Sequence, residues 1–192
     1  MKRKTAKEIL AESFREVAEK KPIDKITIKD ITDNCGYSPA TFYRQFSDKY
    51  DLIAWDYIHR TTEIMNKVGV DDYKWKNTWL DAFRFFEDNL HYLKNLLEHT
   101  NGHDSFVRYM SAANTEHLSK CIIQINGLDK INDDLIIYIQ TYCCGTAQVA
   151  CEWILGNVKT DGQHLAELFE KALPEPLKEY LYRMRELCSY LS

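Results

Sequence analysis

The sequence contains little proline and little glycine, 4 and 7 residues among 192. No apolar run approaches the roughly 20 residues that a membrane-spanning helix needs. The charged N-terminus is not followed by the apolar segment of a secretion signal. We therefore expect a cytoplasmic protein without membrane contact. With 45% hydrophobic and 28% charged residues, the composition is typical of a globular and largely helical protein.

Motifs of enzymes and metal sites are also missing. The sequence has no nucleophile elbow, no phosphate-binding glycine loop and no HExxH motif. The six cysteines form no CxxC pair, and the histidines are not spaced as metal ligands, so reduced buried thiols are expected. We predict no catalytic residues, no metal and no cofactor. A carboxylate active site on the acidic helices is the enzyme alternative, although scattered Asp and Glu residues usually form a solvated face.

The net charge of −4 is unevenly distributed along the chain. Residues 1–60 carry 12 Lys and Arg against 10 Asp and Glu, whereas the remainder carries 13 against 19. An acidic protein can still bind DNA when its basic part is local. The N-terminal third is therefore the part suited to an anionic partner.

Two short helices are predicted within this N-terminal third. Thr27 and Asp30 have the spacing of a capping box, and Gly36 stands where a short helix should end. Ser38 and Pro39 are suited to the N-cap and the first residue of a second helix. Two short helices joined by a glycine-containing turn predict a helix-turn-helix motif, whose second helix enters the major groove of DNA.

The second helix and the start of the next helix suggest DNA contacts. Phe42 and Phe46 lie four residues apart and share a buried face, which directs the intervening residues outward. Asp48 is suited to cap a third helix and leaves Lys49 in its first turn. A lysine is unfavourable at the positive end of a helix dipole, so Lys49 is predicted to support an external anion such as a phosphate.

The whole chain is predicted to be all-α. Further helices are expected over residues 5–20, 49–68, 75–98, 106–126, 133–156, 161–172 and 174–190. The helix over 75–98 has the clearest periodicity, with one continuous apolar face. We predict an N-terminal three-helix unit with the helix-turn-helix motif, residues 1–50, joined by a connecting helix to a C-terminal helical effector and dimerisation domain, residues 51–192.

The stretch from Thr27 to Leu52 resembles the TetR family of bacterial transcription regulators. The resemblance lies in the turn Gly36-Tyr37, the core Thr41-Phe42-Tyr43, Phe46, and the run from Asp48-Lys49 to Leu52. It implies a homodimer that binds a double-stranded DNA operator and pairs through its last two main helices. The residues implied to hold phosphates are Tyr43, Lys49, Thr27, Tyr37 and Ser38. Those implied to face bases or adjacent backbone are Pro39, Ala40, Thr41, Arg44 and Gln45.

The C-terminal domain is expected to bind an effector. The aromatic residues predicted to line a pocket are Trp79, Phe83, Phe86, Tyr109 and Tyr142, with Trp153 a further member. The polar contacts are assigned to Gln148 and Glu152, or to His91. The alternative is that these residues simply form the core.

A narrower resemblance concerns the kind of effector. The run Thr41-Phe42-Tyr43, the run from Asp48 to Ile53 with Trp55, Gly145 and the run Trp153-Ile154-Leu155-Gly156 look like the TetR subgroup that regulates dihydroxyacetone kinase operons. In that subgroup the C-terminal domain can answer to a kinase-like protein partner.

The predicted function is a sequence-specific DNA-binding regulator. The resemblance implies a repressor whose operator affinity is changed by a small-molecule or protein effector. The alternative of a different class is a helical protein-interaction module in which the helix-turn-helix is merely structural.

Overall fold

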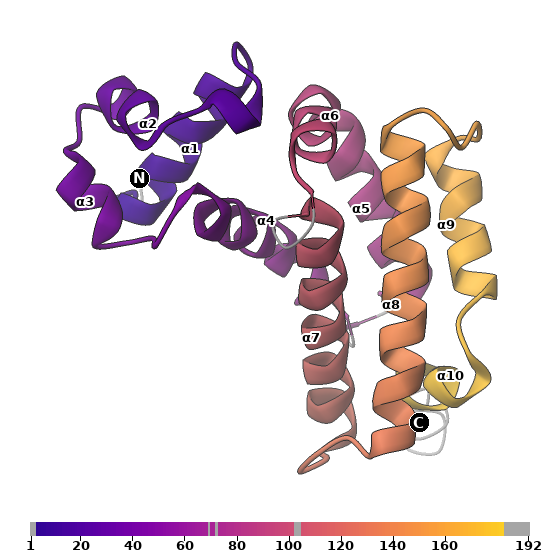
Figure 1. The fold of residues 1–192 in the computed structure, drawn as a ribbon. Helices are drawn as coiled ribbons and strands as arrows, with labels where there is room; N and C mark the ends of the chain where they lie inside the picture. The colour runs from indigo at the N-terminus through magenta and orange to yellow at the C-terminus, as the bar shows by residue number, and fades with distance from the viewer. Residues whose placement is uncertain (1–2, 69, 72, 102–104, 183–192) are drawn as a thin grey trace. The chain divides into compact units, whose positions relative to one another are not determined.

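The computed structural model describes residues 3–68, 70–71, 73–101 and 105–182. Over these residues the chain forms α-helices and one 3-10 helix, without a strand, so the predicted all-α class is confirmed (Figure 1). The elements are α1 Ala6–Ala18, η1 Ile23–Lys25, α2 Ile28–Cys35, α3 Pro39–Tyr43, α4 Lys49–Met65, α5 Trp75–Asp88, α6 Leu90–His99, α7 Phe106–Asn126, α8 Asp133–Ile154, α9 Gly162–Lys171 and α10 Glu175–Tyr182.

The chain packs into two compact units. Unit 1 contains the described residues up to Arg60 together with Asn89–Tyr109, and therefore includes α6. Unit 2 contains the described residues of Thr61–Asp88 and of the chain from Met110 onward. The functional boundary at residue 50 stays a prediction. By packing, the first three turns of α4 and all of α6 belong with α1, α2 and α3.

Unit 1 has its own core, to which every helix contributes. Helix α1 begins with a capping box formed by Thr5 and Glu8. The Ser13 hydroxyl, which is buried, donates to the Ile31 carbonyl at 2.7 Å and so links α1 to α2. The fully buried side chains include Leu10 and Phe14 of α1, Ile31 of α2, Phe42 of α3, Leu52 and Ile53 of α4, and Leu93 and Leu96 of α6.

The single helix predicted over residues 75–98 is wrong, because the structure has two helices there. Helix α5 ends at Asp88, and Asn89 leaves helical geometry at φ −125° and ψ 23° before α6 starts. The Asn89 side chain accepts from Arg60 Nη2 at 2.6 Å. The apolar stripe is continuous in sequence, but Phe83 of α5 is buried in unit 2 and Leu93 of α6 in unit 1.

Unit 2 is built from the end of α4 and from α5, most of α7, α8, α9 and α10. Helix α9 packs along α5 so closely that a Cβ added to Gly162 would lie 2.9 Å from Phe83 Cβ. Helix α4 ends at Met65 instead of residue 68. Of the helix predicted over 174–190, the structure shows Glu175–Tyr182 as helix, and residues 183–190 lie outside the described residues.

Within the described residues, none of the helices combines the length and apolarity that crossing a membrane requires. The same residues contain no group of three His, Cys, Asp or Glu side chains placed to hold a metal ion.

Candidate nucleic-acid interface

Helices α2 and α3 form a tight helix-turn-helix in unit 1. Thr27 and Asp30 make the capping box at the start of α2, and Gly36 ends this helix with a left-handed φ of +72°. The Tyr37 amide reaches back to the Thr32 carbonyl at 2.9 Å, which completes the C-terminal cap. A non-glycine residue at position 36 would be strained in this conformation.

Helix α3 is short and is held in place by its N-cap and by buried aromatic side chains. The Ser38 hydroxyl accepts from the Thr41 amide at 3.2 Å, and Pro39 occupies the first helical position. Phe42 and Phe46 are buried with ring centroids 5.7 Å apart, and Phe46 lies 5.8 Å from the ring of Trp55 on α4. The apolar face of α3 is therefore used in packing, which leaves its other face for a partner.

Six of the ten predicted DNA-contacting residues lie on α3 or at its two caps, Ser38 and Arg44. Tyr43 is 60% exposed. Arg44 Nη2 donates to Thr41 Oγ1 at 3.1 Å, and Thr41 Oγ1 also lies 3.1 Å from Ser38 Oγ. The exposed members of the predicted set are Thr27, Ser38, Pro39, Ala40, Tyr43 and Arg44, and the half-buried ones are Tyr37, Thr41, Gln45 and Lys49. Their contacts with DNA stay a prediction.

Lys49 is the member whose surroundings differ most from the prediction. Its ammonium donates to the carbonyl oxygens of Ile23, Asp24 and Ile26 at 2.9, 3.2 and 3.0 Å. Three carbonyls use all three N–H groups of an ammonium. Burial lowers the pKa of Lys49. The predicted phosphate contact would require one of these bonds to be given up, so the lysine at the start of α4 has a structural explanation.

Two protein families match this chain. Residues 9–54 match the bacterial regulatory proteins of the tetR family. Residues 73–175, more than half of the chain, match the family described as the transcriptional regulator C-terminal region. The chain belongs to the TetR family. It is accordingly a DNA-binding regulator of transcription.

Individual TetR-type proteins are similar over different lengths. The dhaKLM operon transcriptional activator DhaS of Lactococcus lactis is 26% identical over 81 residues, which are 42% of this chain and 43% of DhaS. The match thus spans less than half of that relative.

Solved structures show the same fold. A structure of a dihydroxyacetone kinase operon activator DhaS has a TM-score of 0.61 at 19% identity, covering 90% of this chain and 96% of that one. A TetR regulator from Rhodococcus sp. RHA1 has a TM-score of 0.59 at 13% identity, covering 88% and 98%. At these identities the likeness shows a TetR fold.

The predicted effector residues of this TetR protein fall into two groups. Trp79, Phe83, Phe86 and Tyr142 are brought together as buried members of one aromatic cluster in unit 2. The Tyr142 hydroxyl accepts from the indole N–H groups of Trp75 and Trp79, both at 3.0 Å, and donates to the Phe169 carbonyl at 2.8 Å. These groups satisfy one another, as in a packed core.

Trp153 joins this cluster through its ring, whose centroid lies 5.1 Å from that of Phe83, whereas the other predicted effector residues do not. Tyr109 belongs to unit 1. Gln148 and Glu152 lie on α8, where Gln148 Nε2 donates to Glu152 Oε1 at 3.0 Å. His91, in unit 1, pairs with Glu19 at 3.1 Å. The roles of all these residues in effector binding stay a prediction.

Sequence reasoning missed a hollow of about 470 Å³ in unit 2, a volume within the range of small-molecule pockets. None of the predicted effector residues lines it. The available signal was the apolar character of the end of α4 and of α7. The lining residues are Met65, Asn66, Val68, Val70, Cys121, Gln124 and Ile125.

Proposed function

We propose that this regulator binds its operator through the outward face of α3 and acts as a homodimer whose operator affinity is changed by an effector at unit 2. The observation that carries the DNA-binding mode is the short helix α3, whose Phe42 is buried in the core while Tyr43 and the adjacent Arg44 are exposed. A regulator of this kind works in the cytoplasm, where the chromosome is.

Fluorescence anisotropy with purified protein tests the proposed DNA interface. The duplexes are the protein's own upstream DNA, the DNA upstream of any dihydroxyacetone kinase operon in the same genome, and a scrambled control. The second duplex is chosen because the relative DhaS is named for such an operon. We expect binding to one of the first two that exceeds scrambled binding by about 10³-fold or more.

Arg44→Ala should weaken operator binding by about tenfold, because an arginine contact to a base or phosphate is lost. Lys171→Ala, which removes an exposed lysine of α9, is the matched control and should leave the affinity unchanged.

Titrations of Lys49→Ala at two salt concentrations decide the role of Lys49. A salt slope lower by about one unit indicates a phosphate contact, whereas an unchanged slope indicates that Lys49 acts only through the three carbonyls.

Unchanged affinity in Arg44→Ala would contradict the proposed interface. If the wild type also fails to select any sequence from a random DNA library, the interaction-module alternative replaces the regulator.

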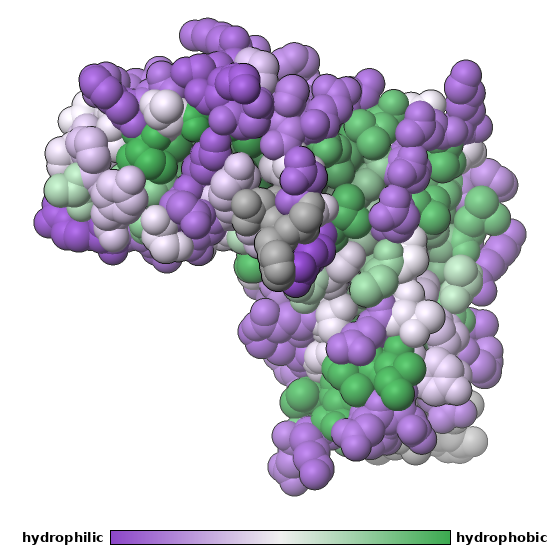
Figure 2. Space-filling view, in the orientation of Figure 1, coloured by the Kyte–Doolittle hydropathy of each residue, from purple (hydrophilic) through white to green (hydrophobic). Residues whose placement is uncertain are grey.

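The proposed homodimer is supported by apolar side chains that α8 and α9 leave exposed. Ile137 is 59% exposed, Val149 37% and Leu168 of α9 42%. Ile137, Thr141, Gly145 and Val149 follow one another at intervals of four and therefore lie on one face of α8. A Cβ added at Gly145 would meet nothing within 4 Å, so this face has room for another helix. Figure 2 shows hydrophobic residues gathered over α7, α8 and α9.

Ile137→Glu should weaken the dimer by at least about tenfold, because a charge would be buried within the proposed interface. Analytical ultracentrifugation over a concentration series measures the change. The matched control is Leu90→Glu, which alters an exposed leucine of α6 in unit 1 and should leave the dimer intact. A wild-type monomer at tens of micromolar, or an unchanged Ile137→Glu dimer, would contradict the proposed interface.

The effector is proposed to act by shifting the population of two conformations. It changes operator affinity only by the difference in its affinity for the two states, on a scale of about 1–3 kcal/mol. The hollow lined by Met65 and Cys121 is the described cavity of suitable size in unit 2. The resemblance implies repression, whereas the relative DhaS is named an activator. A reporter fused to the operator distinguishes the two signs of control.

A further inference from the structure

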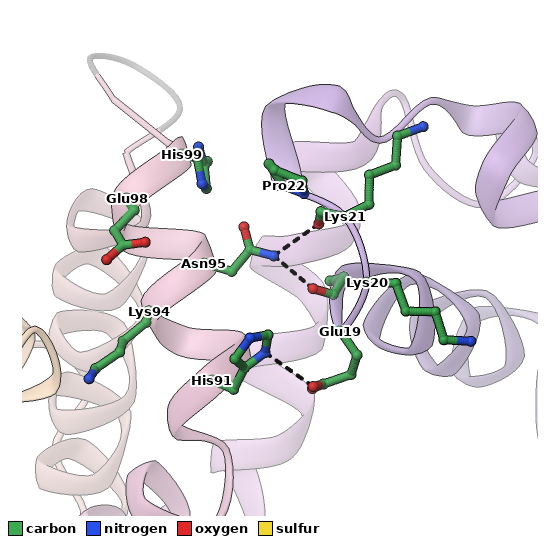
Figure 3. A pocket seen from close by; sticks show the side chains of 10 residues that line it. Glu19, Lys20, Lys21, Pro22, His91, Lys94, Asn95, Glu98 and His99 are labelled. Atoms are coloured by element: carbon green, nitrogen blue, oxygen red, sulfur yellow. Dashed lines mark hydrogen bonds and ion pairs between the residues drawn. The ribbon is translucent and has the colours of Figure 1, made fainter.

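A single side chain of α6 holds the turn that follows α1. Asn95 Nδ2 donates to the carbonyl oxygens of Ala18 and Lys21, at 2.7 and 3.0 Å (Figure 3). Asn95 Oδ1 accepts from the Ile23 amide at 3.0 Å. The amide thus uses both of its donors and its acceptor on backbone groups of one short segment. Because backbone groups are held, a displacement of Asn95 moves the turn itself.

Lys49 holds the same turn through neighbouring carbonyl groups. The Ile23 carbonyl accepts from Lys49 Nζ at 2.9 Å, while the Ile23 amide donates to Asn95. The Ile23 side chain is fully buried. One residue is therefore fixed through its N–H by α6, through its C=O by α4 and through its side chain by the core.

Two histidines strengthen the contact between α6 and this turn. His91 Nδ1 lies 3.1 Å from Glu19 Oε2, and His99 Nδ1 lies 3.4 Å from Asp24 Oδ1. Both histidines are four residues from Asn95, so all three side chains project from one face of α6. These contacts are at least partly exposed and therefore weak, which leaves Asn95 as the main connection.

The end of this chain of contacts lies next to the recognition helix α3. Lys49 is the first residue of α4, and Phe46, three residues earlier, is buried against Phe42 of α3 and against Trp55 of α4. A change in the position of Lys49 therefore acts on the segment that leaves α3.

We infer that Asn95 is a positioning residue for DNA binding. It acts from α6 through the turn at Ile23 on Lys49, and so on the position of α3. Asn95 contacts no DNA in this scheme. The inference rests on the proposed DNA-binding function of α3.

The test compares Asn95→Ala with Asn126→Ala. Asn126 Nδ2 also donates to two carbonyl oxygens, those of Ile122 and Tyr180 at 2.9 and 3.1 Å, but in unit 2. Asn95→Ala should weaken operator binding by about tenfold with an unchanged salt slope, because no phosphate contact is removed. Asn126→Ala should change affinity by less than about twofold at a temperature where thermal unfolding shows both variants folded.

A double-variant cycle tests the route. If Asn95 acts through Lys49, the combined variant Asn95→Ala/Lys49→Met loses clearly less affinity than the product of the two single losses. The inference is overturned if the affinity losses of the two single variants multiply in the combined variant. It is also overturned if folded Asn95→Ala binds the operator with unchanged affinity.

Amide hydrogen exchange at Ile23, followed by NMR, gives a readout without DNA. Exchange should be about tenfold faster in Asn95→Ala and also faster in Lys49→Met, because each variant releases one side of the same residue. If the amide exchange rate at Ile23 is unchanged in Lys49→Met, the proposed link from Asn95 to Lys49 is overturned, even when the wild type binds its operator. Failure of the wild-type chain to bind any operator overturns the proposed function instead, and the exchange result still decides whether Asn95 and Lys49 are coupled.

Discussion

Tyr142→Phe should lower the free energy of unfolding of unit 2 by about 3 kcal/mol. The change removes one oxygen and leaves the indole N–H groups of Trp75 and Trp79 and the Phe169 carbonyl without their shared partner. Each buried polar group deprived of its hydrogen bond costs about 1–3 kcal/mol. Burial raises the pKa of Tyr142, so its hydroxyl stays protonated and keeps its donor role at physiological pH.

Thermal unfolding followed by tryptophan fluorescence measures this loss, with an expected fall in Tm of about 6–12 °C. Tyr43→Phe removes the same atom from a side chain that is 60% exposed and is the matched control, with a change within about 0.5 kcal/mol. A Tyr142→Phe melt that coincides with wild type would show that the aromatic cluster can rearrange, as a ligand-binding pocket would.

Arg15→Met should destabilise unit 1 by about 3 kcal/mol at neutral pH. Arg15 Nη1 of α1 forms an ion pair with the buried Asp56 carboxylate of α4, which also accepts from the Tyr92 hydroxyl of α6 at 3.4 Å. Removing one partner of a buried pair leaves a poorly compensated charge. The side chain of methionine keeps most of the apolar stem, so the loss reflects mainly the charge.

The destabilisation of Arg15→Met should shrink as the pH falls. Burial raises the pKa of Asp56 in the folded protein, and Arg15 opposes this rise. Without Arg15 the folded-state pKa rises further above the unfolded value. The folded state then binds a proton more readily than the unfolded state, so stability is gained as the pH falls through the folded pKa and is lost as it rises.

Urea unfolding at pH 7 and pH 5 measures this pH dependence. Arg84→Met, which removes an exposed arginine from its ion pair with Asp81 in unit 2, is the control and should change stability by less than about 0.5 kcal/mol at either pH. An Arg15→Met variant as stable as wild type at pH 7 would mean that the neighbouring Arg60 alone compensates Asp56.

Local signals in the sequence were sufficient to predict the helix-turn-helix. The capping interactions of Thr27, Gly36 and Ser38 join residues only a few positions apart, and each residue has the predicted capping role in the structure. The break at Asn89 could not be predicted in this way. Periodicity reports that a face is buried, but it does not report which core buries it, and the two halves of the stripe pack in different units.

Long-range contacts account for what the sequence did not show at the candidate site. The helix-dipole argument predicted an external anion as the partner of Lys49. It could not identify the carbonyls that hold the ammonium, because Ile23, Asp24 and Ile26 are distant from Lys49 in sequence. Asn95 carried only a weak signal, a polar residue between Leu93 and Leu96. The pocket prediction relied on aromatic spacing, which a satisfied core and a ligand site share, and Gln148 lies on an exposed part of α8.

Unit 1, which contains the helix-turn-helix, is discontinuous in sequence. A fragment cut after Arg60 keeps α1, α2 and α3 but loses α6, and with it Tyr92 and Asn95. Chimaeras that graft the first 60 residues onto the C-terminal part of another regulator would therefore place this helix-turn-helix beside a foreign sixth helix. Recombination between such regulators should keep function only when α6 is exchanged together with α1, α2 and α3, so the exchanged part is larger than the helix-turn-helix motif.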